Sequence, residues 1–270
     1  MNKIGLIAGN RNFPLLFSKQ AKLKNPSLKI LAVAVKGETN RKLSSFVDQI
    51  RWVNIGELNK LIDIFLSQGI KEVVMAGQIS PYRIFKDRNK WDDLIHKVVE
   101  SSPDFRPHYI FTEIIKEIEK HNLKFISSIT YLSDYLALDG INNNVQVGKH
   151  LEEEINYGVS LARRIVDLDI GQTVVFKDKA VVAVEALEGT DNTIRRAYRI
   201  CGSSFLVIKL ARKNQDLRFD VPVVGLSTIK LLKKCKAKAL ILQKGKTIIL
   251  DKGAVIYLAD KILLPIVGVE

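Results

Sequence analysis

Apolar residues in the first part of the chain form short runs that alternate with amphipathic stretches. The runs at 3–8, 30–35, 49–54 and 71–76 predict β-strands. A proline in the first turn indicates a helix over 14–21, and a second helix is predicted from the spacing of Leu58, Leu61 and Phe65, with Gly69 at its end. Strands that alternate with helices are typical of a doubly wound, mainly parallel sheet.

The pattern changes in the second part of the chain. Residues 92–122 are predicted to be mostly helical with a break near Pro103, whereas 140–148 lacks periodicity. The elements expected beyond it are a helix over 151–168, a hairpin of 173–176 with 180–186, a helix over 192–200, a strand over 205–210, a helix over 228–235, and strands near Leu240 and Ile248. We therefore expect an N-terminal Rossmann-like α/β domain (1–130), a linker (131–150) and a C-terminal mixed α/β domain (151–270) that carries the main acidic motifs.

Composition is that of a globular chain: 47% of the 270 residues are hydrophobic and 26% are charged. The longest apolar runs fall far short of the roughly 18 to 20 residues that span a bilayer, and the N-terminal run is too short for a secretory signal. These features predict a cytoplasmic protein. Cys201 and Cys235 stand in unlike contexts, so we interpret both as structural and expect neither a disulfide nor a thiolate metal site.

Positive charge is concentrated in one region. Between Arg195 and Lys246 the chain has 14 Lys or Arg and two acids, Asp216 and Asp220, which accounts for nearly all of the net charge of +13. Such a region suits phosphate groups, an anionic membrane surface or nucleic acid. For the stretch 230–238 a merely solvated face remains an equal alternative.

The first candidate site is the acidic stretch 185–191, which closes a predicted strand and opens a helix. Glu188 and Asp191 flank Gly189 and Thr190, so carboxylates, a hydroxyl and backbone amides can converge there. A helix N-terminus accepts phosphate, and acids beside it can hold Mg²⁺ between phosphate oxygens. Helix capping by Thr190 or Asp191 alone would explain one acid of this stretch and leave the others without a role.

The second candidate site is the stretch 215–225. Asp216 and Asp220 are the acids of the basic region, and Pro222 with Gly225 predicts a turn that aims Asp220 into a cleft. One interpretation is ordinary surface ion pairing. The other is that basic side chains bind a polyphosphate while the carboxylates hold a metal or activate water.

A third, weaker candidate is the pair of glycines that follow predicted strands, Gly9 and Gly77. The GxGxxG spacing is absent, which argues against a dehydrogenase-type dinucleotide fold, and the Walker A, HExxH and GxSxG patterns are missing as well. The histidines all lie outside the three stretches. A carboxylate is therefore the expected general base.

The ordered motifs of the second half strongly resemble those of the LpxI-type UDP-2,3-diacylglucosamine pyrophosphatases of lipid A biosynthesis. They are Asp169-Ile170-Gly171-Gln172, the run 183–191, Arg195-Arg196, and the run 215–222 followed by Gly225. Weaker similarity at Gly9, Pro14, 75–77 and Asp92-Asp93 extends it over essentially the whole chain. Arg11 departs from the pattern, because the family usually has glycine there.

The resemblance implies a magnesium-dependent hydrolase that cleaves UDP-2,3-diacylglucosamine to UMP and 2,3-diacylglucosamine 1-phosphate in a cleft between two domains. The implied catalytic residues are Asp220, Asp191 and Glu188, and Asp191, Glu188, Asp220 and Asp216 are the metal candidates. The substrate-binding candidates are Gly9, Asn10, Gly77, Gln78, Thr190, Arg195, Lys209, Gln215 and Arg218. The expected partners are this lipid-modified UDP-sugar and the anionic inner-membrane surface, which residues 230–246 would contact peripherally. The sequence does not decide whether the protein forms a homodimer.

Two alternatives belong to other classes of function. A basic nucleic-acid- or nucleotide-binding protein without catalysis would need aromatic residues among its positive charges, and only Tyr198, Phe205 and Phe219 lie in the basic region. We therefore expect no nucleic-acid partner. A sugar-nucleotide transferase would pass the phosphoryl group to an alcohol instead of water.

Overall fold

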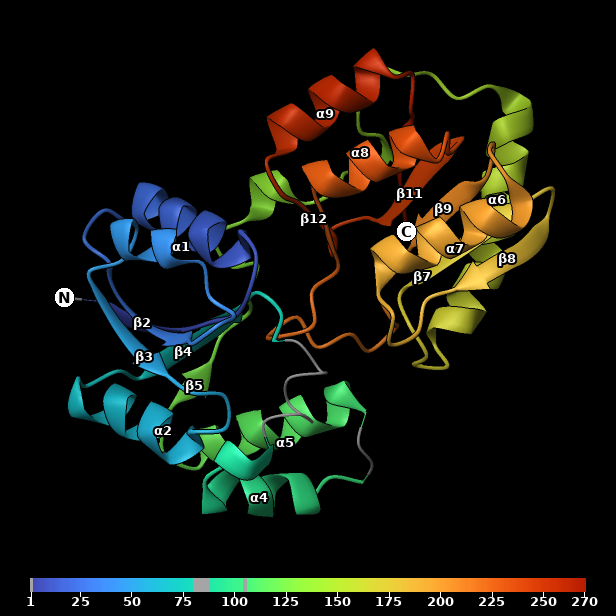
Figure 1. The fold of residues 1–270 in the computed structure, drawn as a ribbon. Coiled ribbons are helices and arrows are strands. Elements are labelled where there is room, and N and C mark those ends of the chain that lie inside the picture. Colours follow the sequence, from blue (N-terminus) through green and yellow to red (C-terminus); the bar gives the residue numbers. More distant parts are fainter. Residues whose placement is uncertain (1, 80–87, 104–105) are drawn as a thin grey trace. The chain divides into compact units, whose positions relative to one another are not determined.

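The computed structural model describes residues 2–79, 88–103 and 106–270 (Figure 1). The chain folds into two compact units. Unit 1 consists of Met1–Leu132 together with Asp216–Asp220, and unit 2 consists of Ser133–Gln215 and Val221–Glu270. A five-residue segment from the second half of the sequence is therefore part of the first unit.

Unit 1 is built on a five-stranded parallel sheet in the order β3-β2-β1-β4-β5. Its strands are β1 (Lys3–Ala8), β2 (Lys29–Val35), β3 (Gln49–Val53), β4 (Glu72–Ala76) and β5 (Lys124–Phe125), and its described α-helices are α1 (Phe13–Lys24), α2 (Leu58–Ser67), α4 (Asp93–Glu100) and α5 (Pro107–Glu119). Helix α1 covers one face of the sheet, and α2, α4 and α5 lie on the other (Figure 1). This confirms the predicted doubly wound, parallel sheet.

The strands of unit 1 are apolar on both sides because helices cover both faces. After the first residue, every residue of β1, β2 and β4 is buried. The strand order runs one way from β1 to β3 and the other way from β1 to β5. In open α/β sheets, ligands bind outside the carboxyl ends of the strands at such a reversal, which here falls between β1 and β4.

Unit 2 contains a six-stranded mixed sheet in the order β6-β13-β11-β9-β7-β8 and a separate parallel pair, β10-β12. The strands are β6 (Gly140–Ile141), β7 (Thr173–Lys177), β8 (Ala180–Val184), β9 (Leu206–Lys209), β10 (Val223–Val224), β11 (Ala239–Gln243), β12 (Ile248–Ile249) and β13 (Ile266–Val269). The helices are α6 (Lys149–Val166), α7 (Thr190–Cys201), α8 (Leu226–Lys234) and α9 (Lys252–Lys261).

The two faces of the unit 2 sheet have separate cores. Leu206 and Ile208 of β9 pack with α6, whereas Val207 between them packs with α7, α8 and α9 on the opposite face. Strands β9, β11 and β13 are parallel, and β7 with β8 forms the predicted antiparallel hairpin. The mixed α/β domain is thus confirmed.

The fold gives no special role to the two cysteines or to the longest apolar runs of the sequence. Cys201 and Cys235 are both free thiols, and burial raises the pKa of the Cys235 thiol. None of the described helices has both the length and the apolar character that crossing a bilayer would require.

Candidate functional site

Gly9 and Gly77 bring the ends of β1 and β4 together at the reversal of strand order. The amide of Gly9 donates to the carbonyl of Ala76 at 2.8 Å, and that of Asn10 donates to the carbonyl of Gln78 at 2.7 Å. A Cβ atom on Gly9 would lie 2.6 Å from the Gln78 carbonyl oxygen. One on Gly77, whose φ is 86°, would lie 2.6 Å from that of Asn10. The two loops therefore need glycine at both positions.

Asn10, which follows Gly9, is the first of several polar residues beside these glycines. Its side-chain amide nitrogen, Nδ2, donates to the carboxylate of Glu38 at 2.9 Å. Its side-chain oxygen, Oδ1, is buried without a hydrogen-bond partner among the described residues. An open hollow of about 790 Å³ lies next to Glu38, lined by Lys36, Thr39, Arg41, Ser44 and Trp52 among others. Arg11 adopts a φ of 62°, the left-handed conformation that explains why glycine suits this position.

The segment Asp216–Asp220 is anchored at the same edge of the unit 1 sheet. The amide of Ser128, which follows β5, donates to the carbonyl of Leu217 at 2.9 Å. The Ser128 hydroxyl lies 2.6 Å from the carbonyl oxygen of Met75 in β4 and 2.7 Å from that of Arg218. One buried serine thus joins the second acidic motif to the carboxyl end of the strand that precedes Gly77.

Asp216 and Arg218 form a two-residue ion pair within this segment. The guanidinium donates to both carboxylate oxygens of Asp216 and reaches Glu119 of α5 at 3.2 Å. Burial alone would raise the pKa of Asp216, but the bonds from Arg218 outweigh it and lower that pKa. Both residues therefore serve to hold the segment on unit 1.

Asp220 ends the segment and Phe219 secures it. The backbone amide of Asp220 donates to the carbonyl of Asp216 at 3.0 Å, which closes one turn. Phe219 packs against the core of unit 1, where its ring stacks on His108 at 5.5 Å between centroids and lies tilted against Phe111 of α5 at 5.8 Å. The Asp220 side chain is half-buried at the end of this anchored turn.

In unit 2 a buried polar cluster gathers around Lys209, the last residue of β9. The Lys209 ammonium donates to the hydroxyl of Thr190 at 2.8 Å and lies 3.4 Å from that of Thr173. The Thr190 hydroxyl donates to one oxygen of Glu185 at 3.0 Å, and the other oxygen is 3.7 Å from Lys209. Side-chain exposure is 7% for Lys209 and 13% for Glu185, so water barely screens this pair.

Glu188 and Asp191 differ in what holds them at the beginning of α7. Glu188 accepts from Arg196 at 2.5 Å and from the amide of Ala186. Burial alone would raise the pKa of Glu188, but Arg196 and backbone amides lower it. The Asp191 carboxylate, in the first turn of the helix, has no partner among the described residues. Asp191 is thus the acid of this motif that is open to a ligand.

The remaining predicted binding residues have local contacts. Gln215 is buried and accepts from the amide and guanidinium of Arg212, which fixes the turn before the second motif. Arg212 also pairs with Asp169. Arg195 is exposed on α7 and donates to Asn192 at 3.1 Å, and Gln78 is exposed at the reversal of strand order. The first motif and Lys209 lie in unit 2, whereas the segment Asp216–Asp220 of the second motif belongs to unit 1.

The predicted metal ligands fit a divalent cation unequally. Mg²⁺ commonly takes one or two carboxylates together with substrate phosphates and water. Asp191 offers an unpaired carboxylate, whereas Glu188 and Asp216 would first have to leave their arginine partners. In the described part of the chain no three His, Cys, Asp or Glu side chains converge as a ready metal site. The donor chemistry fits a cation that arrives with a phosphate-bearing ligand.

Sequence reasoning did not single out three polar residues that the structure makes prominent: Glu38, Ser128 and Thr173. Thr173 begins strand β7, and Glu38 and Ser128 each follow a strand by three residues. Their shared feature in the sequence is a polar side chain at a strand end. A search for polar side chains at strand ends would have included these residues, but it would also have included many ordinary surface residues.

Comparison with known proteins matches both parts of the chain to one family. The model of the LpxI N-terminal domain matches residues 3–135, and that of the LpxI C-terminal domain matches residues 139–267. The UDP-2,3-diacylglucosamine pyrophosphatase LpxI of Caulobacter vibrioides is 24% identical over 284 aligned positions, which cover 100% of this chain and 98% of the relative.

Solved structures give only distant matches. A UDP-glucose 4-epimerase from Bifidobacterium longum, in complex with NAD+ and UDP, is 13% identical with a TM-score of 0.28, covering 60% of this chain and 50% of the epimerase. The biotin carboxylase subunit of pyruvate carboxylase is 13% identical with a TM-score of 0.28, covering 80% and 52%. The chain spans about half the length of each, and neither likeness carries an argument.

Proposed function

Because the chain belongs to the LpxI family, whose two domain models together match it almost from end to end, we propose that it hydrolyses UDP-2,3-diacylglucosamine to UMP and 2,3-diacylglucosamine 1-phosphate, a step of lipid A biosynthesis. The full-length match to a pyrophosphatase of this name carries the proposal. The two polar sites described above support it, because each offers the groups that a pyrophosphate ester needs.

The nucleotide end of the substrate is assigned to unit 1. Gly9 and Gly77 leave backbone exposed where a parallel sheet places its ligands, and the buried Asn10 oxygen offers an acceptor beside them. Trp52 and the lysine and arginine side chains of the neighbouring hollow suit a base and its phosphates.

The hydrolytic step is assigned to carboxylates. Asp220 orients a water molecule and accepts its proton as the new P–O bond forms and the bond to the bridging oxygen breaks, so that water supplies the hydroxyl to one phosphate. Lys209, Thr190 and the first turn of α7 supply positive potential for the phosphate oxygens. A divalent cation held by the Asp191 carboxylate would add neutralisation of charge on those oxygens.

Release of UMP by the purified chain tests this function directly. We expect UMP from UDP-2,3-diacylglucosamine in the presence of Mg²⁺, loss of that product with excess EDTA, and recovery when Mg²⁺ is restored. UDP-glucose, which has no acyl chains, serves as the control substrate. Full activity in EDTA after dialysis would refute the metal requirement but leave the hydrolase intact. Absence of UMP under every condition would refute the hydrolase.

The nucleic-acid-binding alternative has little support in the described residues. Several cations of the basic region are occupied by acids of the same chain, as in the pairs Arg196–Glu188, Arg212–Asp169 and Lys238–Glu154. These paired cations are therefore not available to track a phosphate backbone.

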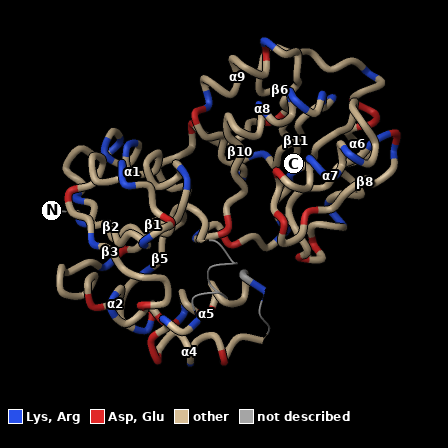
Figure 2. The backbone as a smooth tube through the Cα atoms, in the orientation of Figure 1, with Lys and Arg blue, Asp and Glu red and all other residues tan. Residues whose placement is uncertain are grey.

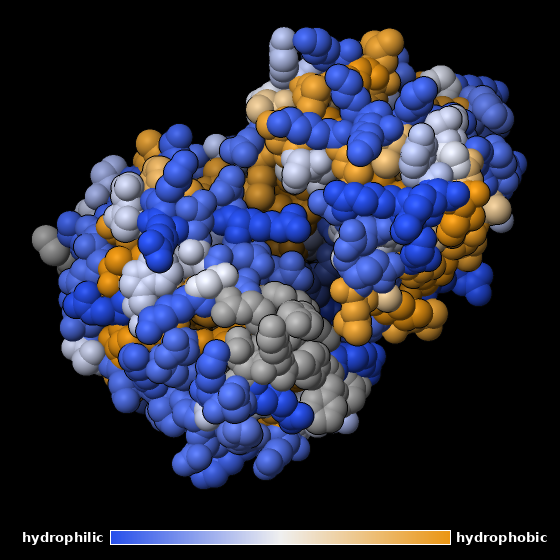
Figure 3. Space-filling view, in the orientation of Figure 1, coloured by the Kyte–Doolittle hydropathy of each residue, from blue (hydrophilic) through white to orange (hydrophobic). Residues whose placement is uncertain are grey.

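Peripheral contact with an anionic membrane is proposed for helix α8. Lys230, Lys233 and Lys234 are exposed on it at helical spacing, and Lys236 follows in the next turn, none with an ion pair among the described residues. Figure 2 shows where the basic and acidic residues lie along the backbone. Figure 3 shows that apolar areas interrupt the hydrophilic surface on the face in view.

Vesicle sedimentation tests the membrane proposal. Each exposed lysine near an anionic surface contributes about 1 kcal/mol, screened over a Debye length of about 8 Å at physiological salt. Replacement of Lys230, Lys233 and Lys234 by glutamine should therefore weaken binding to phosphatidylglycerol vesicles by about a hundredfold at low salt. Replacement of Lys60 and Lys116, on helices α2 and α5, by glutamine is the control for a loss of positive charge elsewhere on the protein. Equal binding of the wild type to neutral and anionic vesicles would contradict the proposal.

A further inference from the structure

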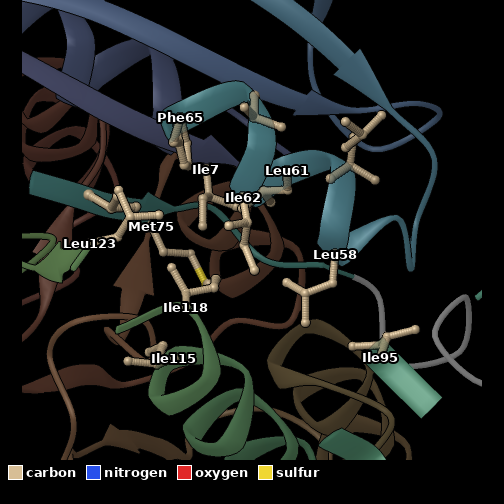
Figure 4. Packing of buried hydrophobic residues seen from close by; sticks show 14 of the residues in the cluster. Ile7, Leu58, Leu61, Ile62, Phe65, Met75, Ile95, Ile115, Ile118 and Leu123 are labelled. Atoms are coloured by element: carbon tan, nitrogen blue, oxygen red, sulfur yellow. The ribbon is translucent and has the colours of Figure 1, made fainter. Parts of the chain in front are cut away.

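An apolar cavity of about 80 Å³ lies inside unit 1, between the sheet and helices α2, α4 and α5. Figure 4 shows Ile7, Leu58, Met75 and Ile118 from four different elements pointing toward one another in this part of the core. A water molecule needs only roughly 10 to 15 Å³ of such space, so the cavity is several times larger than a packing defect that one water would fill.

The cavity lies at the functional edge of the sheet. Its floor is formed by Ile7, Val35, Val53 and Met75, each the last or next-to-last residue of β1, β2, β3 and β4. All four strands are parallel, so these residues lie at their carboxyl ends. Gly77 follows Met75 by two residues. The cavity therefore adjoins the place where the strand order reverses.

The wall of the cavity is chemically uniform. Its residues are aliphatic or aromatic apart from Asn54, Gly56 and Glu57. The two polar side chains satisfy each other, because the amide and side-chain nitrogens of Asn54 donate to the Glu57 carboxylate at 2.6 and 2.9 Å. Burial alone would raise the pKa of Glu57, but these bonds and Lys60 lower it. The charged carboxylate thus lies at one border, and the remaining wall suits a hydrocarbon.

We propose that this cavity receives the end of one acyl chain of the substrate. The inference rests on the proposed function, since it takes UDP-2,3-diacylglucosamine as the ligand. It adds a binding site inside unit 1 for one of the two chains. The chain enters from the carboxyl edge of the sheet and ends against the residues of α4 and α5 that line the cavity.

A larger side chain in place of Val99 of α4 should fill the cavity. Val99 lines the cavity and is 3% exposed. Its neighbour Val98 is equally buried, at 4%, and contacts the same core without lining the cavity. Val99→Phe places a ring in the empty space, while Val98→Phe places the same ring in packed core. Val98→Phe therefore controls for the added volume in α4, and the melting temperatures of both variants show how much strain each ring causes.

The test compares UMP release from a long-chain substrate and from its diacetyl form at one detergent concentration. Each buried methylene favours binding by about fourfold, so excluding two of them should lower kcat/KM of Val99→Phe for the long-chain substrate by about tenfold or more. The diacetyl substrate should change less than twofold. Val98→Phe should affect both substrates alike, and Val99→Ala should favour the longer chain.

A fluorescent fatty acid, cis-parinaric acid, probes the cavity without requiring turnover. Binding to the wild type that is lost in Val99→Phe, with the melting temperature kept, supports the site even if no UMP is ever released. An equal loss of activity toward both substrates in Val99→Phe would overturn the proposal. Binding of free fatty acid without any discrimination between the long-chain and diacetyl substrates would overturn it too.

Discussion

Replacement of Asp220 by alanine is expected to lower the rate of UMP release by about a hundred- to ten-thousand-fold, the range typical for loss of a general base. The carboxylate ends a turn that other groups hold in place. The amide of Asp220 donates to Asp216, and Phe219 packs on His108 and Phe111. Removal of the carboxylate leaves these contacts intact, so the melting temperature should stay close to that of the wild type.

Substrate affinity separates a catalytic Asp220 from a structural one. The basic and backbone groups proposed to hold the phosphates do not include the Asp220 carboxylate, so affinity should fall far less than turnover. Asp220→Asn keeps the size of the side chain and should be nearly as slow as Asp220→Ala. Asp63→Ala, which removes an exposed carboxylate from α2, serves as the control. Near-normal UMP release from Asp220→Ala would remove this residue from the catalytic set.

The main elements of both units could be predicted because their apolar residues have strong periodicity. The bounds predicted for β1 agree with the structure, and those for β3, α2 and α7 differ by a few residues at most. Helix α9 was not predicted, since only Val255 and Ala259 of it are buried and its apolar stripe is short. Strands of two residues, such as β5 and β10, are too short to produce a pattern.

The location of the acidic motifs depended on tertiary contacts that local patterns do not contain. The sequence indicated that Asp216 and Asp220 follow a strand in the second half, but their attachment to unit 1 depends on Ser128 and Glu119. These partners are 90 and 99 residues away in the chain. No periodicity links positions so far apart, and the proposed convergence of Asp191 and Asp220 on one substrate stays a prediction for the same reason.

Lys209→Met is expected to have the largest effect on stability, because it removes the cation that the described residues place beside the buried Glu185 carboxylate. The Glu185 side chain is only 13% exposed, and one of its carboxylate oxygens has no hydrogen-bond partner among the described residues. Breaking a buried pair from one side typically costs about 3 to 5 kcal/mol in the free energy of unfolding. The Thr190 hydroxyl would also lose its donor from Lys209.

The double variant Lys209→Met/Glu185→Gln distinguishes this explanation from a simple loss of packing. Removing both charges should recover a large part of the stability lost in Lys209→Met, because no uncompensated charge then remains buried. Both tryptophans, Trp52 and Trp91, lie in unit 1, so their fluorescence would miss the change. Amide hydrogen exchange of α7, which begins at Thr190 beside the cluster, follows unit 2 directly. A loss of under about 1 kcal/mol in α7 protection, as for an exposed pair, would contradict a buried and uncompensated Glu185.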